Sequence, residues 1–308
     1  MAATIVHALG GVFDYAGLFP PAKLDMAEAV ANEIRYRNGP ESRILGSFVC
    51  PSSRLEEFAV HLERQLGNVD PVAGPLPVSV LATGGDSVDE LEAGLENDAR
   101  QMTAFEARCE GLAEVSSFEV RLPKQAPLDV VLRDLRSFGA VDLFLELPFD
   151  AELPDRLAAL AEADEAMAKF RTGGLTADDF PSPVVLAEAI RSAIDLGVPF
   201  KLTAGLHHPY RSYRPEVGTE MHGFLNVFVA CALRIEHDLS ASELAAVLED
   251  REPSHFEWRR DGLRYGGMSV SRPTIDLTKD ALRSIGSCSI DEPVADLKVL
   301  GLWVEDAS

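Results

Sequence analysis

Two lysines in this chain stand just before turns that are rich in threonine and glycine. They open the stretches Lys169-Phe170-Arg171-Thr172-Gly173-Gly174 and Lys201-Leu202-Thr203-Ala204-Gly205-Leu206-His207-His208-Pro209. Because the whole sequence holds six lysines, two in equivalent positions predict a functional site. Burial and a second nearby cation can each lower the pKa of a lysine. The neutral amine can then attack a carbonyl group and form a Schiff base.

Other ionisable side chains fall near the ends of predicted apolar strands, where a buried charge needs a partner or a function. Carboxylates there could relay protons, arginines could hold a phosphate or carboxylate, and the turns could present backbone N–H groups to an anion. The predicted catalytic set is Lys169, Lys201, Glu119, Glu146 and His207. The predicted substrate-binding set is Arg121, Arg171, Thr172, Gly173, Gly174, Thr203, Gly205, His208 and Asp14.

The adjacent histidines allow a second interpretation, in which His207, His208 and Glu146 hold a divalent metal. Consecutive side chains on an extended strand point in opposite directions. We therefore favour a single histidine acting as acid or base, and predict no metal or other cofactor. His222, on an apolar segment, is interpreted as a hydrogen-bonded core residue. The simplest alternative to any chemistry is a buried ion-pair network among these charges.

The scaffold must bring several strand ends together, and the chain alternates short apolar runs with amphipathic segments. Seven strands, each followed by a helical segment, are predicted at residues 4–9, 44–50, 78–81, 117–123, 141–148, 165–170 and around Lys201. This alternation is typical of a parallel sheet with crossover helices. It predicts a (β/α)8 barrel, in which functional residues gather at the C-terminal ends of the strands. An open doubly wound sheet is the alternative, although no Gly-x-Gly-x-x-Gly follows the first strand.

The last part of the chain is less regular, and the eighth strand has two candidates, residues 256–270 and 297–303. Residues 1–240 are predicted to form the barrel core, and residues 241–308 an extension that completes or covers it. A hairpin is predicted around Asp261-Gly262. Cys288, Asp291 and Glu292 could belong to a tail that folds over the barrel mouth.

The two lysine motifs resemble the sixth- and seventh-strand motifs of deoxyribose-phosphate aldolase, a class I aldolase on a TIM barrel. Phe48-Val49-Cys50-Pro51 is similar to the second-strand region of that family. The resemblance implies that Lys169 forms the Schiff base, that Lys201 lowers its pKa, and that Glu119 replaces an aspartate that relays protons. Arg171 and the histidine pair depart from the family pattern. The string Lys-x-Thr-Ala-Gly-Leu-His-His-Pro also resembles that of a bacterial family with no assigned function.

The composition is that of a folded protein with a strongly acidic charge. The 308 residues are 46% hydrophobic and 25% charged, enough for one large core. The formal net charge of −22 disfavours binding to nucleic acid or to an anionic membrane. The four cysteines are widely spaced and there is no long apolar run, so the sequence predicts a cytoplasmic protein with free thiols.

The predicted function is therefore that of an enzyme, a class I aldolase-like lyase that acts on a small anionic carbonyl compound. Its partner would be that small molecule, and assembly into a homo-oligomer is compatible with the sequence. Two alternatives stay open at this point. One is a metal-dependent lyase, isomerase or hydrolase that uses the histidine pair and the strand-end carboxylates. The other is a noncatalytic barrel that binds a small ligand.

Overall fold

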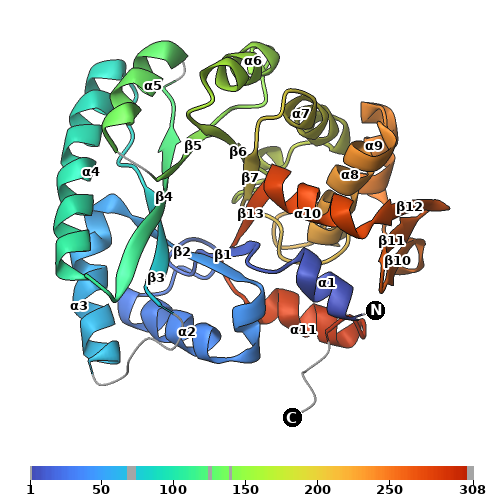
Figure 1. The fold of residues 1–308 in the computed structure, drawn as a ribbon, viewed down its shortest axis with the longest axis horizontal. Helices are drawn as coiled ribbons and strands as arrows, with labels where there is room; N and C mark the ends of the chain where they lie inside the picture. Colours follow the sequence, from blue (N-terminus) through green and yellow to red (C-terminus); the bar gives the residue numbers. More distant parts are fainter. Residues whose placement is uncertain (1, 68–73, 124–126, 139–140, 304–308) are drawn as a thin grey trace.

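The computed structural model describes residues 2–67, 74–123, 127–138 and 141–303. Eight parallel strands close into a barrel in the order β1-β13-β7-β6-β5-β4-β3-β2, with helices around it (Figure 1). The predicted (β/α)8 barrel is confirmed, and the open doubly wound sheet is wrong. The barrel strands are β1 (Phe13–Tyr15), β2 (Leu45–Pro51), β3 (Leu76–Leu81), β4 (Ala113–Arg121), β5 (Asp142–Glu146), β6 (Met167–Arg171), β7 (Phe200–Thr203) and β13 (Leu282–Ser287).

Helices follow most of the strands, and a smaller sheet lies beside the barrel near α8 (Figure 1). The helices are α1 (Ala2–Ala8), α2 (Met26–Asn38), α3 (Leu55–Leu66), α4 (Val88–Arg108), α5 (Leu128–Leu135), α6 (Leu153–Ala163), α7 (Pro183–Asp195), α8 (Phe224–His237), α9 (Ala241–Glu249), α10 (Arg272–Ala281) and α11 (Asp291–Val299). The short strands are β8 (Ser212–Arg214), β9 (Thr219–Met221), β10 (Phe256–Arg259), β11 (Gly262–Tyr265) and β12 (Met268–Ser271). β10 and β11 form the predicted hairpin.

Side chains alternate between the two faces of each barrel strand, as the period of two requires. The outward residues are apolar and pack on helices. Phe48 of β2, for example, stacks on Phe58 of α3 with ring centroids 4.7 Å apart. The inward residues are polar on several strands, and the sheet register sets Lys169 beside Lys201 and beside Glu146. The fold thus combines an apolar outer layer with a polar barrel interior.

The first strand is not where the sequence predicted it. Residues 4–9 belong largely to α1, and β1 lies instead at Phe13–Tyr15. The buried residues Ile5, Ala8 and Leu9 follow the three- and four-residue spacing of a helix face. The helical period was therefore present in the sequence, although the apolar run resembles a strand.

The eighth strand also lies outside both predicted candidates. β13 (Leu282–Ser287) pairs with β1 on one side and with β7 on the other, and so closes the barrel. Residues 256–270 form the smaller antiparallel sheet, and most of 297–303 lies at and after the end of α11. The part of residues 241–308 that the structure describes thus supplies a barrel strand, while residues 304–308 lie outside the described residues.

Each of the described helices falls short of the combination of length and apolar character that crossing a membrane requires.

Candidate functional site

Five ionisable side chains of alternating charge meet inside the barrel. Lys169 Nζ lies 2.8 Å from Glu119 Oε2 and 2.9 Å from Glu146 Oε2. Lys201 Nζ lies 2.8 Å from Glu119 Oε1 and 2.6 Å from Asp14 Oδ2. Glu119 therefore bridges the two lysines, and the order of contacts is Glu146, Lys169, Glu119, Lys201, Asp14. The structure brings together four of the five residues of the predicted catalytic set, all but His207, with Asp14 from the substrate-binding set.

The charges of this network reverse the predicted direction of the pKa shift of the two lysines. Burial alone would lower the pKa of Lys169 and of Lys201, but the carboxylates on either side outweigh it and raise both pKa values. Burial likewise opposes ionisation of Glu119, yet its two lysine neighbours lower the pKa of its carboxyl group. The prediction of a neutral resting lysine is therefore wrong, because three carboxylates surround two ammonium groups.

A cavity of about 440 Å³, the upper cavity, lies at the C-terminal ends of the strands, directly above the network. Its inner part is lined by Glu119, Lys169 and Lys201. Its walls are lined by apolar side chains, among them Phe19 and Phe180. The side chain of Lys169 is 8% exposed, and that of Lys201 is 1% exposed. Lys169 is thus the lysine that is more accessible to a bound molecule.

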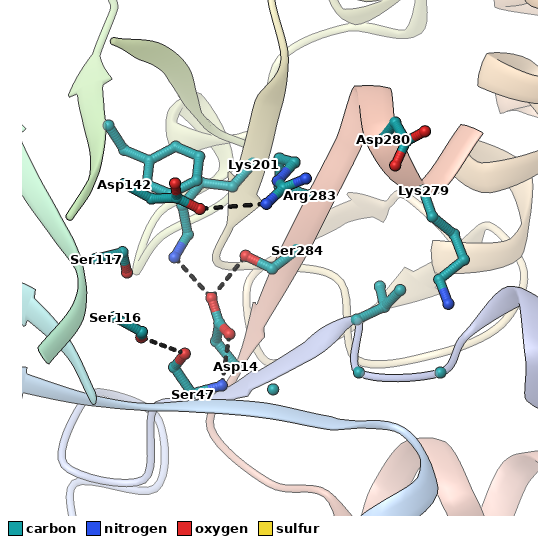
Figure 2. Close-up of a pocket in the computed structure, with 15 residues that line it drawn as sticks. Asp14, Ser47, Ser116, Ser117, Asp142, Lys201, Lys279, Asp280, Arg283 and Ser284 are labelled. Carbon is teal, nitrogen blue, oxygen red and sulfur yellow. Dashed lines mark hydrogen bonds and ion pairs between the residues drawn. The ribbon is translucent and has the colours of Figure 1, made fainter. Parts of the chain in front are cut away.

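A second cavity, of about 310 Å³, approaches the network from the N-terminal ends of the strands (Figure 2). In Figure 2, Lys201 and Ser284 point toward the carboxylate of Asp14 from neighbouring strands. Ser284 Oγ donates to Asp14 Oδ2 over 2.6 Å, and the backbone N–H of Ser47 donates to Asp14 Oδ1 over 2.9 Å. Among the described residues, Lys201 is the one lining residue that the two cavities share, so its ammonium group lies in the partition between them.

The predicted turn residues hold the loops after β6 and β7 together at the rim of the upper cavity. Thr172 Oγ1 donates to the carbonyl oxygen of Ala204 over 2.6 Å. The backbone N–H of Thr172 donates to the carbonyl oxygen of Thr203 over 2.8 Å. Gly205 has a φ of +77° and packs against the Gly173 backbone. Gly174, Thr203 and Gly205 line the cavity, whereas Thr172 and Gly173 support it from behind. The main role of Thr172 is therefore structural.

The two predicted arginines lie at different places. Arg171 is exposed and lines the upper cavity and also a neighbouring hollow of about 890 Å³ at the ends of β3 to β5. Arg121 also lines the hollow of about 890 Å³, and its guanidinium group lies 3.3 Å from the carboxylate of Asp86. Arg171 can therefore meet a ligand next to Lys169, whereas Arg121 lies outside the upper cavity.

The two histidines have separate partners near the upper cavity. His207 Nδ1 lies 3.1 Å from Glu292 Oε2 and 3.8 Å from Cys288 Sγ. His208 Nδ1 lies 2.6 Å from Asp296 Oδ2. Burial alone would lower the pKa of His207, but the contacts with Cys288 and Glu292 raise it to about 9. Within the described part of the chain, the predicted metal ligands His207, His208 and Glu146 do not converge, because Glu146 pairs with Lys169.

His222 is a hydrogen-bonded core residue, as predicted, and Cys50 is also buried in the core. His222 Nε2 contacts the carbonyl of Pro181 over 2.8 Å, and burial lowers its pKa to about 4. Asn226, one turn later, donates to the carbonyls of Val247 and Asp250. Cys50 is fully buried, which raises the pKa of its thiol.

The sequence reasoning missed the serines that support the network. Ser79 Oγ donates to Glu119 Oε1 over 2.5 Å, and Ser117 Oγ donates to Ser79 Oγ over 2.7 Å. Ser117 stands two residues before Glu119, on the same face of β4, so the strand period could have indicated it. Ser284 carried no such signal because its strand was not predicted.

No family model matches the chain, and no curated protein matches it in sequence. Among solved structures, the chain is similar to a protein from Pseudomonas aeruginosa described as a dihydrodipicolinate synthetase, with 14% identity, a TM-score of 0.38 and 64% of each chain covered. It is also similar to muconate lactonizing enzyme from Klebsiella pneumoniae, with 14% identity, a TM-score of 0.29, and coverage of 77% of this chain and 64% of that one. The chain thus spans less than two thirds of either structure. These likenesses are too low to bear on the activity of this chain.

Proposed function

We propose that this protein is a class I aldolase-like lyase that forms a Schiff base between Lys169 and a small anionic carbonyl compound. The observation that carries the proposal is the position of Lys169. It lies at the inner end of the 440 Å³ cavity, between Glu119 and Glu146, with Lys201 on the neighbouring strand. A reactive lysine needs access to a carbonyl group and a nearby proton acceptor, and this position offers both.

The charged resting state of Lys169 makes its deprotonation the first chemical step. Glu146 is the acceptor that the geometry favours, because its Oε2 lies 2.9 Å from Nζ and its side chain is 18% exposed. Glu119 is less suited, because its contacts with both lysines lower the pKa of its carboxyl group. Lys201, held between Asp14 and Glu119, keeps this carboxylate ionised and in place.

The neutral amine of Lys169 then adds to the carbonyl carbon, and the carbonyl oxygen leaves as water after accepting two protons. The resulting iminium group withdraws electrons from the α carbon. When a carboxylate of the site removes the proton of a β-hydroxyl group, the bond between the α and β carbons breaks, the β fragment leaves as a carbonyl compound and the electron pair forms an enamine. Protonation of the α carbon restores the iminium, and water hydrolyses it to release the second product and the ammonium form of Lys169. The carboxylates around Lys169 can return the proton that the first step removed.

Local cations in the cavity suit an anionic substrate. The net charge of −22 repels anions at long range, so their binding needs positive groups at close range. The guanidinium group of Arg171 lines the cavity whose inner end holds the ammonium groups of Lys169 and Lys201. Arginine can hold a carboxylate or phosphate through two hydrogen bonds.

Borohydride trapping tests the proposal. The protein is incubated with a panel of small aldehydes and keto acids, reduced with borohydride and mapped by peptide mass spectrometry. We expect a reduced adduct on Lys169 that is absent in Lys169→Met and retained in Lys279→Met, a lysine that lies at the opposite end of the barrel. An adduct confined to Lys201 would contradict the assignment of Lys169. Failure of every compound to label either lysine would contradict the Schiff-base function.

A further inference from the structure

We infer that His207, Cys288 and Glu292 form a metal site suited to Zn²⁺ at the upper cavity. Within the described residues, these three side chains are the group in which one potential ligand atom from each lies within 4.8 Å of the others. The ligand types, imidazole, thiolate and carboxylate, are those that zinc binds in proteins. All three residues line the 440 Å³ cavity.

The two separations that involve His207 are close to those of a tetrahedral zinc site, and the third, between Cys288 and Glu292, is within 4.8 Å. Zinc bond lengths of about 2.3 Å to sulfur and about 2.0–2.1 Å to nitrogen or oxygen give tetrahedral edges of roughly 3.6 Å for sulfur to nitrogen and roughly 3.3 Å for nitrogen to oxygen. Cys288 Sγ lies 3.8 Å from His207 Nδ1, and Glu292 Oε2 lies 3.1 Å from the same nitrogen. Small side-chain shifts would therefore bring the three atoms to coordinating distance.

The same contacts argue against a catalytic triad of cysteine, histidine and glutamate. In a triad the histidine faces the nucleophile with one ring nitrogen and the carboxylate with the other. Here the thiol and the carboxylate both face Nδ1 of His207. Three donor atoms that converge on a common point are the arrangement of a coordination site rather than of a proton relay.

The barrel positions these residues through two neighbouring strands. His207 follows β7, and Cys288 follows β13, which pairs with β7 in parallel. Glu292 lies in the first turn of α11, four residues after Cys288. Cys288 is buried, the side chain of His207 is 12% exposed, and that of Glu292 is 50% exposed. One side of the group is therefore sheltered, and the other side faces the cavity.

Three protein ligands leave the fourth tetrahedral position open, which is the arrangement of zinc sites that bind water or substrate. A thiolate and a carboxylate also balance the charge of the divalent ion. The open position would accept an anionic oxygen of a molecule in the cavity, such as a carboxylate or phosphate. This substrate-binding role rests on the proposed function, whereas the metal site itself does not.

Titration of the full-length protein with Zn²⁺ and with Co²⁺ tests the site. We expect saturable binding of Zn²⁺ with one ion per chain. Co²⁺, which replaces zinc, should give a thiolate-to-metal charge-transfer band in the near ultraviolet together with visible bands typical of tetrahedral coordination. Cys288→Ser should abolish the charge-transfer band, and Cys288→Ser, His207→Gln and Glu292→Gln should each weaken Zn²⁺ binding by at least about tenfold.

Two variants serve as matched controls. Cys109→Ser removes a buried thiol at the end of α4, and Glu216→Gln removes a negative charge from the lining of the same cavity. Both should keep the affinity and the Co²⁺ spectrum of the parent. Absence of stoichiometric Zn²⁺ binding by the parent would overturn the inference. So would a charge-transfer band that persists in Cys288→Ser, or an equal loss of affinity in Glu216→Gln.

The metal site and the lysine chemistry can fail separately. Zinc binding without any borohydride adduct would support the metal site and contradict the Schiff-base function. An adduct on Lys169 in a protein that binds no zinc would support the Schiff-base function and contradict the metal site. If both hold, Zn²⁺ should increase adduct formation with an anionic keto acid more than with an uncharged aldehyde.

Discussion

Glu119 is the residue on which the buried charge network depends, because its two carboxylate oxygens contact different lysines. Oε1 lies 2.8 Å from Lys201, and Oε2 lies 2.8 Å from Lys169. Without this charge, each ammonium group would keep one carboxylate, Asp14 for Lys201 and Glu146 for Lys169. Buried charges are tolerated only while partners compensate them, so the network is sensitive to the loss of its central member.

We predict that Glu119→Gln lowers the free energy of unfolding by about 3–5 kcal/mol, as is typical when one member of a buried charge network is removed. The same change at Glu114, which is exposed near the start of the same strand, should alter it by less than about 0.5 kcal/mol. Urea denaturation at neutral pH measures both values. Equal stability of Glu119→Gln and the parent would mean that the network contributes little to folding.

The loops after β6 and β7 are the elements that shape the cavity rim, and they meet through their backbones. A Cβ atom on Gly205 would lie 2.9 Å from the carbonyl oxygen of Thr172 and 3.1 Å from Cα of Gly173. The backbone of Gly205 also has a φ of +77°, a conformation that glycine adopts readily and other residues do not. Both the space and the conformation at this point therefore require glycine.

We predict that Gly205→Ala lowers the free energy of unfolding by at least about 2 kcal/mol, because it combines a strained φ with overpacking. Gly197 is the matched control, since its φ is +68° but its Cβ would meet no atom within 4 Å. Gly197→Ala should cost about 1–2 kcal/mol from the backbone alone. Thermal unfolding of both variants checks the difference, and equal losses would exclude the steric contribution.

His222, just before α8, links separate loops and should make stability depend on pH. Burial lowers its pKa to about 4, against about 6.5 in an unfolded chain. The folded state therefore binds fewer protons than the unfolded state between these values. Stability should be complete above about pH 6.5 and fall as the pH drops toward 4, by about 3 kcal/mol from this residue.

Denaturation curves between pH 4 and pH 7 test this prediction. The slope of stability against pH should be smaller in His222→Gln than in the parent. It should be unchanged in His61→Gln, which alters a partly exposed histidine on α3. An equal slope in His222→Gln and the parent would show that other groups govern the acid response.

At the scale of the whole molecule, the barrel is closed by a strand from near the end of the chain. β13 lies between β1 and β7, so residues 1–240 contain seven of the eight barrel strands. Without β13, β1 and β7 would each expose an unpaired edge, and Asp14 would lose the hydroxyl of Ser284.

We predict that a fragment of residues 1–240 does not unfold cooperatively, whereas the full chain does. The shorter fragment lacks β13 and α10, a helix that packs on it, so the barrel interior would be open to water. Circular dichroism during heating, together with dispersion of amide signals in NMR spectra, measures both. A cooperative transition in the shorter fragment would show that the barrel core folds without its eighth strand.

Local patterns in the sequence were enough to predict the barrel and part of its polar interior. Ionisable residues near the C-terminal ends of predicted apolar strands indicated that Glu119, Lys169 and Lys201 meet at one mouth of the barrel, because the ends of parallel strands converge there. That pattern is local, so it can be recognised without the fold. It failed for β1 and β13, since a short apolar run fits a helix or a strand and Leu282–Ser287 carries a weak strand pattern.

Which charges meet, and hence the sign of the lysine pKa shifts, depends on contacts that form when the barrel closes. Two neighbouring lysines suggest a lowered pKa, but the positions of Asp14, Glu119 and Glu146 raise it. Likewise, Cys288 and Glu292 meet His207 because β13, a strand that was not predicted from the sequence, ends just before Cys288 and leads into α11. Electrostatic interactions depend on distances between side chains remote in sequence, and those distances are set only when the barrel closes.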